Sequence, residues 1–215
     1  EMSSRGLGDV YKRQVLNWYK KLKKHKYKFM KFDIVEFYPS ISEKLLSKAL
    51  AFAKESTKVS EQEIKIILNA SKSVLHNKEE VWVKRKSNTE ENELFDITMG
   101  GKHGAEICEL VGLYILHKLR NALPNLTTGL YRDDGLMVIE KNKSNVDIEK
   151  IKKSMHNISK EMGIKLDIEN PSRKINYLDL SFNLYNHTFQ PYRKENSKII
   201  YICLLYTSDA ADEAK

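Results

Sequence analysis

Two adjacent aspartates, Asp133 and Asp134, stand in the stretch GLYRDDGLMVIE at residues 129–140. Short apolar runs flank them, so the stretch predicts two strands, 129–132 and 136–140, joined by a tight turn. The simplest interpretation is structural, because Asp-Gly is a strong signal for a type I′ turn in which Gly135 supplies the positive φ. The other interpretation is chemical, since such a hairpin can also hold two carboxylates at the end of a sheet.

The periodicity of the rest of the chain predicts an α+β fold. A strand is expected at 28–35, and helical spacing behind serine caps predicts helices at 42–56 and 60–75. Further elements are a hairpin formed by 80–85 and 94–98, a buried helix at 104–123, a helix at 147–163 and a strand at 164–169. This order is β-α-β-β-α-β with inserted helices and a hairpin, the ferredoxin-like plan of an antiparallel sheet backed by helices.

A third carboxylate, Asp33, joins the pair if this plan is right, because the first strand then ends beside the central hairpin. Three carboxylates at one sheet end repel one another, and the repulsion raises the pKa of at least one of them. Two Mg²⁺ ions, with Mn²⁺ as a substitute, would relieve the repulsion because Mg²⁺ prefers hard oxygen ligands. Two ions about 3.5–4 Å apart can activate a 3′-hydroxyl and stabilise a leaving pyrophosphate. The pattern therefore favours nucleotidyl transfer.

Five stretches in order resemble the motifs of reverse transcriptases. FDIVEFYPSI (32–41) resembles the first palm motif, YRDD (131–134) resembles the signature Tyr-x-Asp-Asp, and MGGKHGAEIC (99–108) stands at the place of the glycine-containing template motif. GIKLDIE (163–169) and INYLDLSFNL (175–184) resemble the two later palm motifs, the second of which is the primer grip. The motif sequences are most similar to those of Penelope-like or other eukaryotic non-viral elements. Group II intron and retron enzymes are the alternatives within the family.

The resemblance implies a palm domain of an RNA-directed DNA polymerase from a mobile retroelement, acting on an RNA template, a DNA primer and deoxynucleoside triphosphates. It implies catalytic and metal-binding roles for Asp33, Asp133 and Asp134, with Ile34 also at the metals. Further implied residues are Phe37, Tyr38, Gly100 and Gly101 at the nucleotide, and Tyr131, Arg132, Leu178 and Asp179 at the primer or template.

Each of these residues also has a structural interpretation. Phe37 and Tyr38 could pack in the core, Gly100 and Gly101 could form a turn before a helix, and residues 178–179 could belong to a buried strand. Arg132 stands where the family usually has a small or apolar residue, and the motif at 99–108 lacks the usual Gln-Gly and Ser-Pro pairs.

Other classes of protein fit less well. A viral RNA-dependent RNA polymerase would have Gly before the aspartate pair, where this chain has Tyr131, and a nucleotide cyclase would need a Gly-Gly-Asp/Glu-Glu-Phe hairpin. An RNA-recognition domain would need aromatic strand signatures for base stacking. The alternative function is a non-catalytic or domesticated palm that binds nucleic acid.

The bulk properties suit a nucleic-acid partner. The formal net charge of the 215 residues is +8, which favours a polyanion. No apolar run approaches the roughly 20 residues that cross a bilayer, so we expect an intracellular protein without a membrane partner. Oligomeric state is left open.

The two ends of the chain look foreign to it. DVYKRQ at 9–14 can be back-translated to DNA whose reverse complement, one base out of frame, encodes CLLYTS at 203–208. The shared element resembles the adapter of transposase-based sequencing libraries, so residues 1–14 and 203–215 are expected to be non-native. Residues 15–202 are then a partial palm without fingers or thumb, and Cys108 is their one cysteine, which excludes a disulfide.

Overall fold

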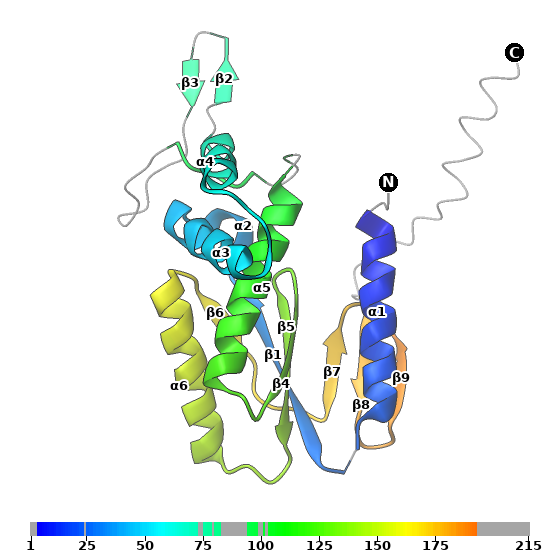
Figure 1. Cartoon of the computed structure of the whole chain (residues 1–215). Coiled ribbons are helices and arrows are strands. Elements are labelled where there is room, and N and C mark those ends of the chain that lie inside the picture. The colour runs from blue at the N-terminus through cyan, green and yellow to red at the C-terminus, as the bar shows by residue number, and fades with distance from the viewer. Residues whose placement is uncertain are drawn as a thin grey trace, which may run out of the picture.

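The computed structural model describes residues 4–23, 25–72, 75–78, 80–82, 94–98, 101 and 103–192 (Figure 1). The helices are α1 (Ser4–Lys21), α2 (Phe37–Ser40), α3 (Glu43–Ser56), α4 (Glu61–Ala70), α5 (Gly104–Ala122) and α6 (Asn145–Met162). The strands are β1 (Tyr27–Ile34), β2 (Leu75–Asn77), β3 (Glu80–Trp82), β4 (Thr127–Tyr131), β5 (Asp134–Glu140), β6 (Leu166–Ile168), β7 (Lys174–Tyr177), β8 (Leu180–Asn183) and β9 (Thr188–Pro191).

The central sheet has the strand order β4-β5-β1-β6, and each neighbouring pair in it is antiparallel. Along the chain, β1, α5, β4, β5, α6 and β6 form the βαββαβ series, while α2, α3, α4 and the β2-β3 hairpin are inserted before α5. The predicted ferredoxin-like α+β fold is confirmed. This order places the end of β1 beside the β4-β5 turn, as the positions of the carboxylates require.

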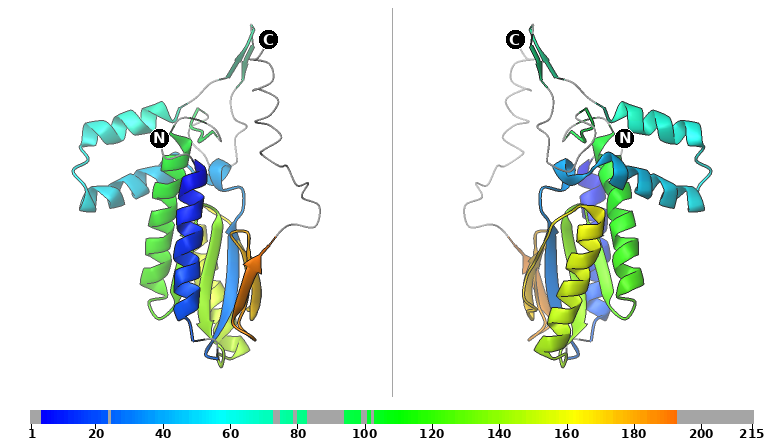
Figure 2. Two further views of the ribbon diagram at one scale, coloured as in Figure 1. Left: turned by 90° about the vertical axis from the view of Figure 1, so that its right-hand side faces the viewer. Right: turned by 90° about the vertical axis from the view of Figure 1, so that its left-hand side faces the viewer.

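The two faces of the sheet pack against different layers, because successive strand residues point to opposite faces. Met30, Phe32 and Ile34 are buried in a core shared with α3, α5 and α6. Phe29, on the other face, packs in a second cluster with Tyr19 of α1 and with residues of β7 and β8. Figure 2 shows α5 and β9 on opposite sides of β1 and β5. The carboxylates therefore lie on the face that α1 and β7-β9 cover. Helices α3, α5 and α6 pack against the other face.

Serine caps begin three helices. Ser42 Oγ accepts from the Leu45 amide, and Ser144 Oγ accepts from the Asp147 amide. At α4, Ser60 and Glu63 form a capping box in both directions. The predicted helices at 42–56 and 147–163 are confirmed, and the helix predicted at 60–75 begins as expected but ends at Ala70. Capping side chains explain the sharp starts, since they satisfy amides that have no partner within the helix.

The hairpin predicted between 80–85 and 94–98 is wrong in its pairing. β3 pairs with β2, with Leu75 opposite Trp82 and Asn77 opposite Glu80. Phe95 instead forms an isolated bridge with Lys72. Lys78, with φ 55, lies in the turn between β2 and β3. Residues 83–93 lie outside the described part of the chain.

Tyr19 of helix α1 packs against the sheet β7-β8-β9 and bonds to it. Tyr19 is 1% exposed, and its hydroxyl lies 2.8 Å from the carbonyl oxygen of Asn183 and 3.0 Å from that of Thr188. The ring packs against Phe182 at 4.7 Å between centroids. Tyr19 lies in the segment 15–202 that is expected to be native, whereas residues 4–14 of the same helix lie in the segment expected to be non-native.

Within the described residues, no helix is both long and apolar enough to cross a membrane.

Candidate active site

Asp33 and Asp134 are direct partners in the β1-β5 ladder. Asp133 precedes Asp134 in the turn that follows β4, and its carbonyl oxygen accepts from the Ile34 amide at 3.0 Å. On the other side of Asp33, the β1-β6 ladder places Asp167 opposite it. Because paired residues in an antiparallel ladder point to the same face, the carboxylates of Asp33, Asp134 and Asp167 share one face of the sheet. The structure thus brings the three predicted aspartates together and adds a fourth.

The turn itself differs from the prediction. Tyr131 pairs with Asp134, so the two turn residues are Arg132 and Asp133, and Arg132 has φ 55. Gly135 lies within β5, opposite Phe32. The Asp-Gly pair is therefore not the turn centre that a type I′ interpretation requires. The glycine is needed for packing, because a Cβ at position 135 would meet the Phe32 ring at 2.1 Å.

The carboxylates interact electrostatically. The pKa of Asp33 is raised above its ordinary value, first by burial and then by the negative charges of Asp133 and Asp134. Lys31 is the nearby cation, with its Nζ 3.3 Å from Asp134 Oδ1. Burial lowers the pKa of Lys31, but the charge and hydrogen bond of Asp134, together with the charges of Glu169 and Asp33, outweigh burial, so this pKa is raised overall. One ammonium thus stands against a cluster of carboxylates, which leaves a net negative site.

The donor set fits Mg²⁺ in chemical type, since carboxylate oxygens are the ligands that Mg²⁺ prefers. Among the described residues, however, no three His, Cys, Asp or Glu side chains are grouped closely enough to hold a metal ion. The Lys31 ammonium already forms an ion pair with Asp134, which leaves this carboxylate less able to bind a metal ion. Ile34 is 1% exposed with its side chain in the helix-facing core, so its backbone is the part that could reach a cation.

Tyr38 and Phe37 follow β1 in the short helix α2 but have different surroundings. Phe37 is 4% exposed and belongs to the core, whereas Tyr38 is half-buried at its edge. The hydroxyl of Tyr38 forms a hydrogen bond with the thiol of Cys108, and the pKa of Cys108 is raised to about 12 chiefly by burial. Burial also raises the pKa of Tyr38, to which Asp133 contributes as well. Asp133 therefore lies close enough to influence both Asp33 and Tyr38.

The glycines before α5 have separate positions. Gly100 lies outside the described residues. The Gly101 amide donates to the Thr98 carbonyl at 3.0 Å, in a turn. Gly104 is the glycine beside Tyr38: a Cβ there would stand 2.8 Å from Thr98 O and 3.7 Å from Tyr38 Cε1.

The expected primer-side residues lie in or beside two neighbouring turns: Arg132 in the β4-β5 turn, Tyr131 at the end of β4, and Leu178 and Asp179 in the β7-β8 turn. Leu178 and Asp179 form the β7-β8 turn with φ values of 50 and 61, a left-handed pair that is unusual for non-glycine residues. The hydroxyl of Tyr177, immediately before this turn, donates to the carbonyl oxygen of Asp134 at 3.1 Å. Arg132 lies over the ring of Tyr131, at 5.5 Å from its centroid. Tyr177 thus ties the β7-β8 turn to the aspartate hairpin.

Helix α1 contacts both turns. The ring of Tyr11 lies 4.6 Å from that of Tyr131, and Lys12 Nζ lies 2.8 Å from Asp179 Oδ2. Both contacting residues fall in the segment predicted to be non-native.

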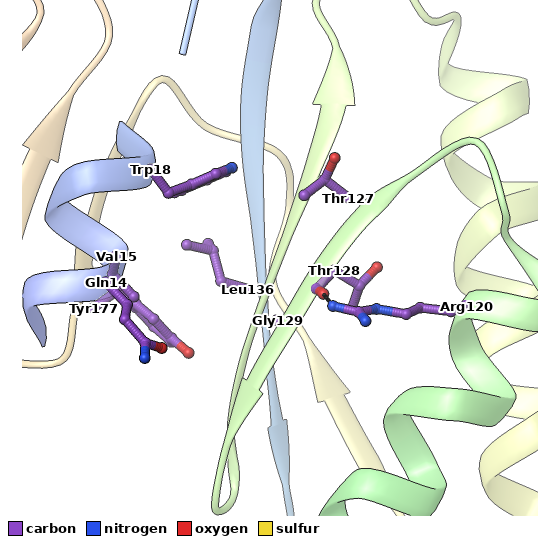
Figure 3. Close-up of a pocket in the computed structure, with 9 residues that line it drawn as sticks. All are labelled: Gln14, Val15, Trp18, Arg120, Thr127, Thr128, Gly129, Leu136 and Tyr177. Carbon is purple, nitrogen blue, oxygen red and sulfur yellow. Dashed lines mark hydrogen bonds between the residues drawn. The ribbon is translucent and has the colours of Figure 1, made fainter. Parts of the chain in front are cut away.

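A cavity of about 220 Å³ opens beside the edge strand β4, next to these turns. Figure 3 shows Trp18 and Val15 of α1 on one side of it and Arg120 of α5 on the other. Arg120 donates to the Thr128 carbonyl at 3.0 Å. Leu136 and Tyr177 complete a largely apolar wall, and Gly129 leaves space because no atom of the described residues lies within 4 Å of where its Cβ would be.

Four residues of this site were not predicted from the sequence. Lys31 precedes Asp33 by two positions in a strand, so period-two alternation could have placed it on the same face. Asp167 lies in a predicted strand, yet only the register shows that it faces Asp33. For Cys108 and Tyr177 no sequence signal exists, because their contacts join residues distant in the chain.

Solved structures of telomerase have the fold of this chain. Telomerase from Candida tropicalis in complex with a TWJ fragment of telomeric RNA matches with a TM-score of 0.57 and 16% identity, over 98% of this chain and 37% of that chain. Apo telomerase from the same organism matches with a TM-score of 0.58 and 14% identity, over 95% and 39%. Apo telomerase truncated from the C-terminal domain matches with a TM-score of 0.53 and 16% identity, over 88% and 40%.

The fold is reverse-transcriptase-like. Telomerase is itself a reverse transcriptase, so these matches support the predicted polymerase palm at the level of the fold. The chain spans less than half the length of the telomerase chains that it matches. No protein-family model and no curated protein matches the chain in sequence.

Proposed function

We propose that the chain is the palm of an RNA-directed DNA polymerase from a mobile retroelement, most similar to the Penelope-like group. In this proposal Asp33, Asp133 and Asp134 bind two Mg²⁺ ions, with Mn²⁺ as a substitute. Two bound ions would supply Lewis-acid activation of the 3′-hydroxyl of a DNA primer and charge stabilisation of the pyrophosphate that leaves a deoxynucleoside triphosphate. An RNA template selects the nucleotide.

The observation that carries the proposal is the pairing of Asp33 with Asp134, with Asp133 in the adjoining turn. Such a cluster is unfavourable without a cation, and the raised pKa of Asp33, due to burial and to both neighbours, expresses that cost. A cation that binds Asp134 must compete with Lys31, which already lies 3.3 Å from it.

The residues around the carboxylates suit the roles that the resemblance implies. Tyr38 is half-buried at the edge of the core, where a sugar could lie against its ring. Phe37, the preceding residue, is buried in that core. Leu178 and Asp179 lie in a turn joined to the aspartate hairpin through Tyr177, so a primer end held there would be positioned relative to the metals. Positioning of this kind supplies most of the rate in phosphoryl transfer.

A metal titration tests the proposal on the chain as it stands. We expect Mn²⁺ to bind with an affinity that Asp133→Asn abolishes, and that Glu161→Gln, which removes one exposed carboxylate of α6, leaves unchanged. Equal Mn²⁺ binding by the wild type and Asp133→Asn would contradict the metal site. It would favour the second candidate function, a palm that binds nucleic acid without catalysis. The ion pair between Lys31 and Asp134 supports that alternative, because Lys31 already neutralises one of the carboxylates.

Primer extension is expected only from the completed gene. Residues 1–215 alone should be nearly inactive, because the chain spans less than half of the telomerase chains that it matches and the triphosphate and primer need further contacts. Robust extension by this chain alone would overturn that expectation.

A further inference from the structure

Four lysines gather at the end of the sheet opposite the carboxylates, and we call them the lysine end: Lys23, Lys26, Lys141 and Lys143. Lys23 and Lys26 lie in the connection between α1 and β1, where the Lys26 amide donates to the Lys23 carbonyl at 3.0 Å. The Lys141 amide donates to the Lys26 carbonyl at 2.7 Å, which joins this connection to the turn after β5. Figure 1 shows both connections together below the sheet. Residues from two distant parts of the chain thus form one basic surface.

The charge of this surface is largely uncompensated. Lys23, Lys26 and Lys141 are exposed, and Lys143 is half-buried. Among the residues that the structure describes, none of the four forms an ion pair with a carboxylate. The neighbouring acids are Glu140 and Asp147. The pKa of Asp147 is lowered first by the hydrogen bond from Ser144 and, among smaller causes, by the charge of Lys143, so two carboxylates stand beside four lysines and the surface keeps an excess of positive charge. Exposed lysines without partners cost little to hold and leave their charge available to a polyanion.

The position of the lysine end relative to the candidate active site limits what can bind. Strand β1 runs from Tyr27 to Ile34, so Lys26 and Asp33 lie roughly 23 Å apart at about 3.3 Å per residue. At the far end, the aspartates repel phosphates unless a cation is bound. A nucleic-acid strand that meets the chain without metal is therefore attracted to the lysine end and repelled from the aspartates.

We propose that the lysine end is a second nucleic-acid contact, which binds the phosphodiester backbone without metal and without reading bases. The inference rests on the proposed function for the identity of the polyanion, but it does not use the aspartates. Lysine ammonium groups are point charges that suit phosphates of either RNA or DNA. Both should therefore bind, with an affinity that falls steeply as salt is raised.

The test measures the salt dependence of binding in EDTA, with a single-stranded RNA and a DNA duplex as separate probes. The variant K23Q/K26Q/K141Q/K143Q is compared with K48Q/K65Q/K153Q/K160Q, which removes the same charge from exposed positions spread over α3, α4 and α6. Each lost phosphate contact should reduce the slope of log K against log salt by about 0.7 for the single strand and 0.9 for the duplex. We expect the first variant to lose roughly 3 in slope and the second to lose less than 1.

An unchanged slope in the first variant, or equal losses in both variants, would overturn the proposal, since binding would then be spread over the whole basic surface. Binding of anionic vesicles that depends on the four lysines, without such binding of RNA or DNA, would also overturn it and indicate a membrane surface. Because the assay contains EDTA and leaves Asp133 intact, its result is independent of the Mn²⁺ titration that tests the proposed function.

Discussion

Gly135 lies directly across the β1-β5 ladder from Phe32, and the Phe32 ring fills the space that a side chain at position 135 would occupy. A Cβ there would stand 2.1 Å from Phe32 Cζ, so Gly135→Ala must displace either the buried ring or the strand that carries Asp134. Overpacking of this kind costs about 1–3 kcal/mol. We expect thermal unfolding of Gly135→Ala to shift down by roughly 2–12 °C, at 2–4 °C per kcal/mol for a chain of this size.

Gly129→Ala is the matched control in the partner strand. In the part of the chain that the structure describes, nothing lies within 4 Å of a Cβ at position 129, so the substitution should be neutral or stabilising by up to about 1 kcal/mol through the unfolded state. If the two alanine variants had the same melting temperature, the packing role of Gly135 would be wrong.

The raised pKa of Asp33 predicts how stability depends on pH. Burial and the charges of Asp133 and Asp134 make the folded chain bind a proton at Asp33 more tightly than the unfolded chain does. The free energy of unfolding therefore falls as pH rises from about 4, the ordinary value for Asp, through the raised pKa. In EDTA at pH 7, Asp33→Asn should melt at a higher temperature than the wild type, and the difference should shrink toward pH 4.

Calorimetry of both chains at the two pH values checks this expectation. Glu161→Gln, which alters one exposed carboxylate on α6, should show no such pH-dependent difference. A lower melting temperature for Asp33→Asn at pH 7 would mean that the carboxylate stabilises the fold, contrary to the electrostatics of the site.

Thr128 holds a hydroxyl that burial leaves unsatisfied. The residue is 2% exposed, and its Oγ1 has no hydrogen-bond partner among the residues that the structure describes, although its carbonyl accepts from Arg120. A buried hydroxyl without a partner costs about 1–3 kcal/mol, so Thr128→Val should raise the free energy of unfolding by about 1 kcal/mol in a urea titration. The neighbouring exposed Thr127→Val should change it by less than about 0.5 kcal/mol. A destabilised Thr128→Val chain would show that the hydroxyl has a partner in solution.

Tyr38 is the residue expected to discriminate between sugars, and the completed gene is needed to test it. A nucleotide whose phosphates reach the aspartates would lay its sugar near this ring, where a ribose 2′-hydroxyl would be desolvated at a cost of about 1–3 kcal/mol. Tyr38→Ala should therefore raise ribonucleotide relative to deoxyribonucleotide kcat/KM by roughly 5- to 150-fold.

Phe37→Ala provides the contrast, because Phe37 is 4% exposed in the core. It should lower stability by about 3–5 kcal/mol and both activities together, with the sugar ratio unchanged. An unaltered ratio in Tyr38→Ala would remove Tyr38 from the nucleotide site.

The sequence by itself determined the elements whose signals are local. Serine caps at Ser42 and Ser60 marked helix starts, and apolar alternation marked β1, β4 and β5, because capping and strand alternation depend on residues close in the chain. From those elements, the βαββαβ order placed Asp33 near Asp133 and Asp134. The β2-β3 hairpin was not predicted from the sequence. Its strands are three residues long, which is too short for an alternating pattern that could be told apart from the end of the helix predicted at 60–75.

Only the tertiary structure decided which side chains meet across the sheet. The pairing of Asp33 with both Asp134 and Asp167, the position of Lys31 against Asp134, and the bond from Tyr177 to the aspartate hairpin all depend on strand register. Register is set by contacts between distant segments, and a slip of one residue would move every side chain to the other face. Register also decides the role of Gly135. The sequence predicted a turn residue there, but the structure places it in β5 opposite Phe32, whose ring occupies the space beside the glycine.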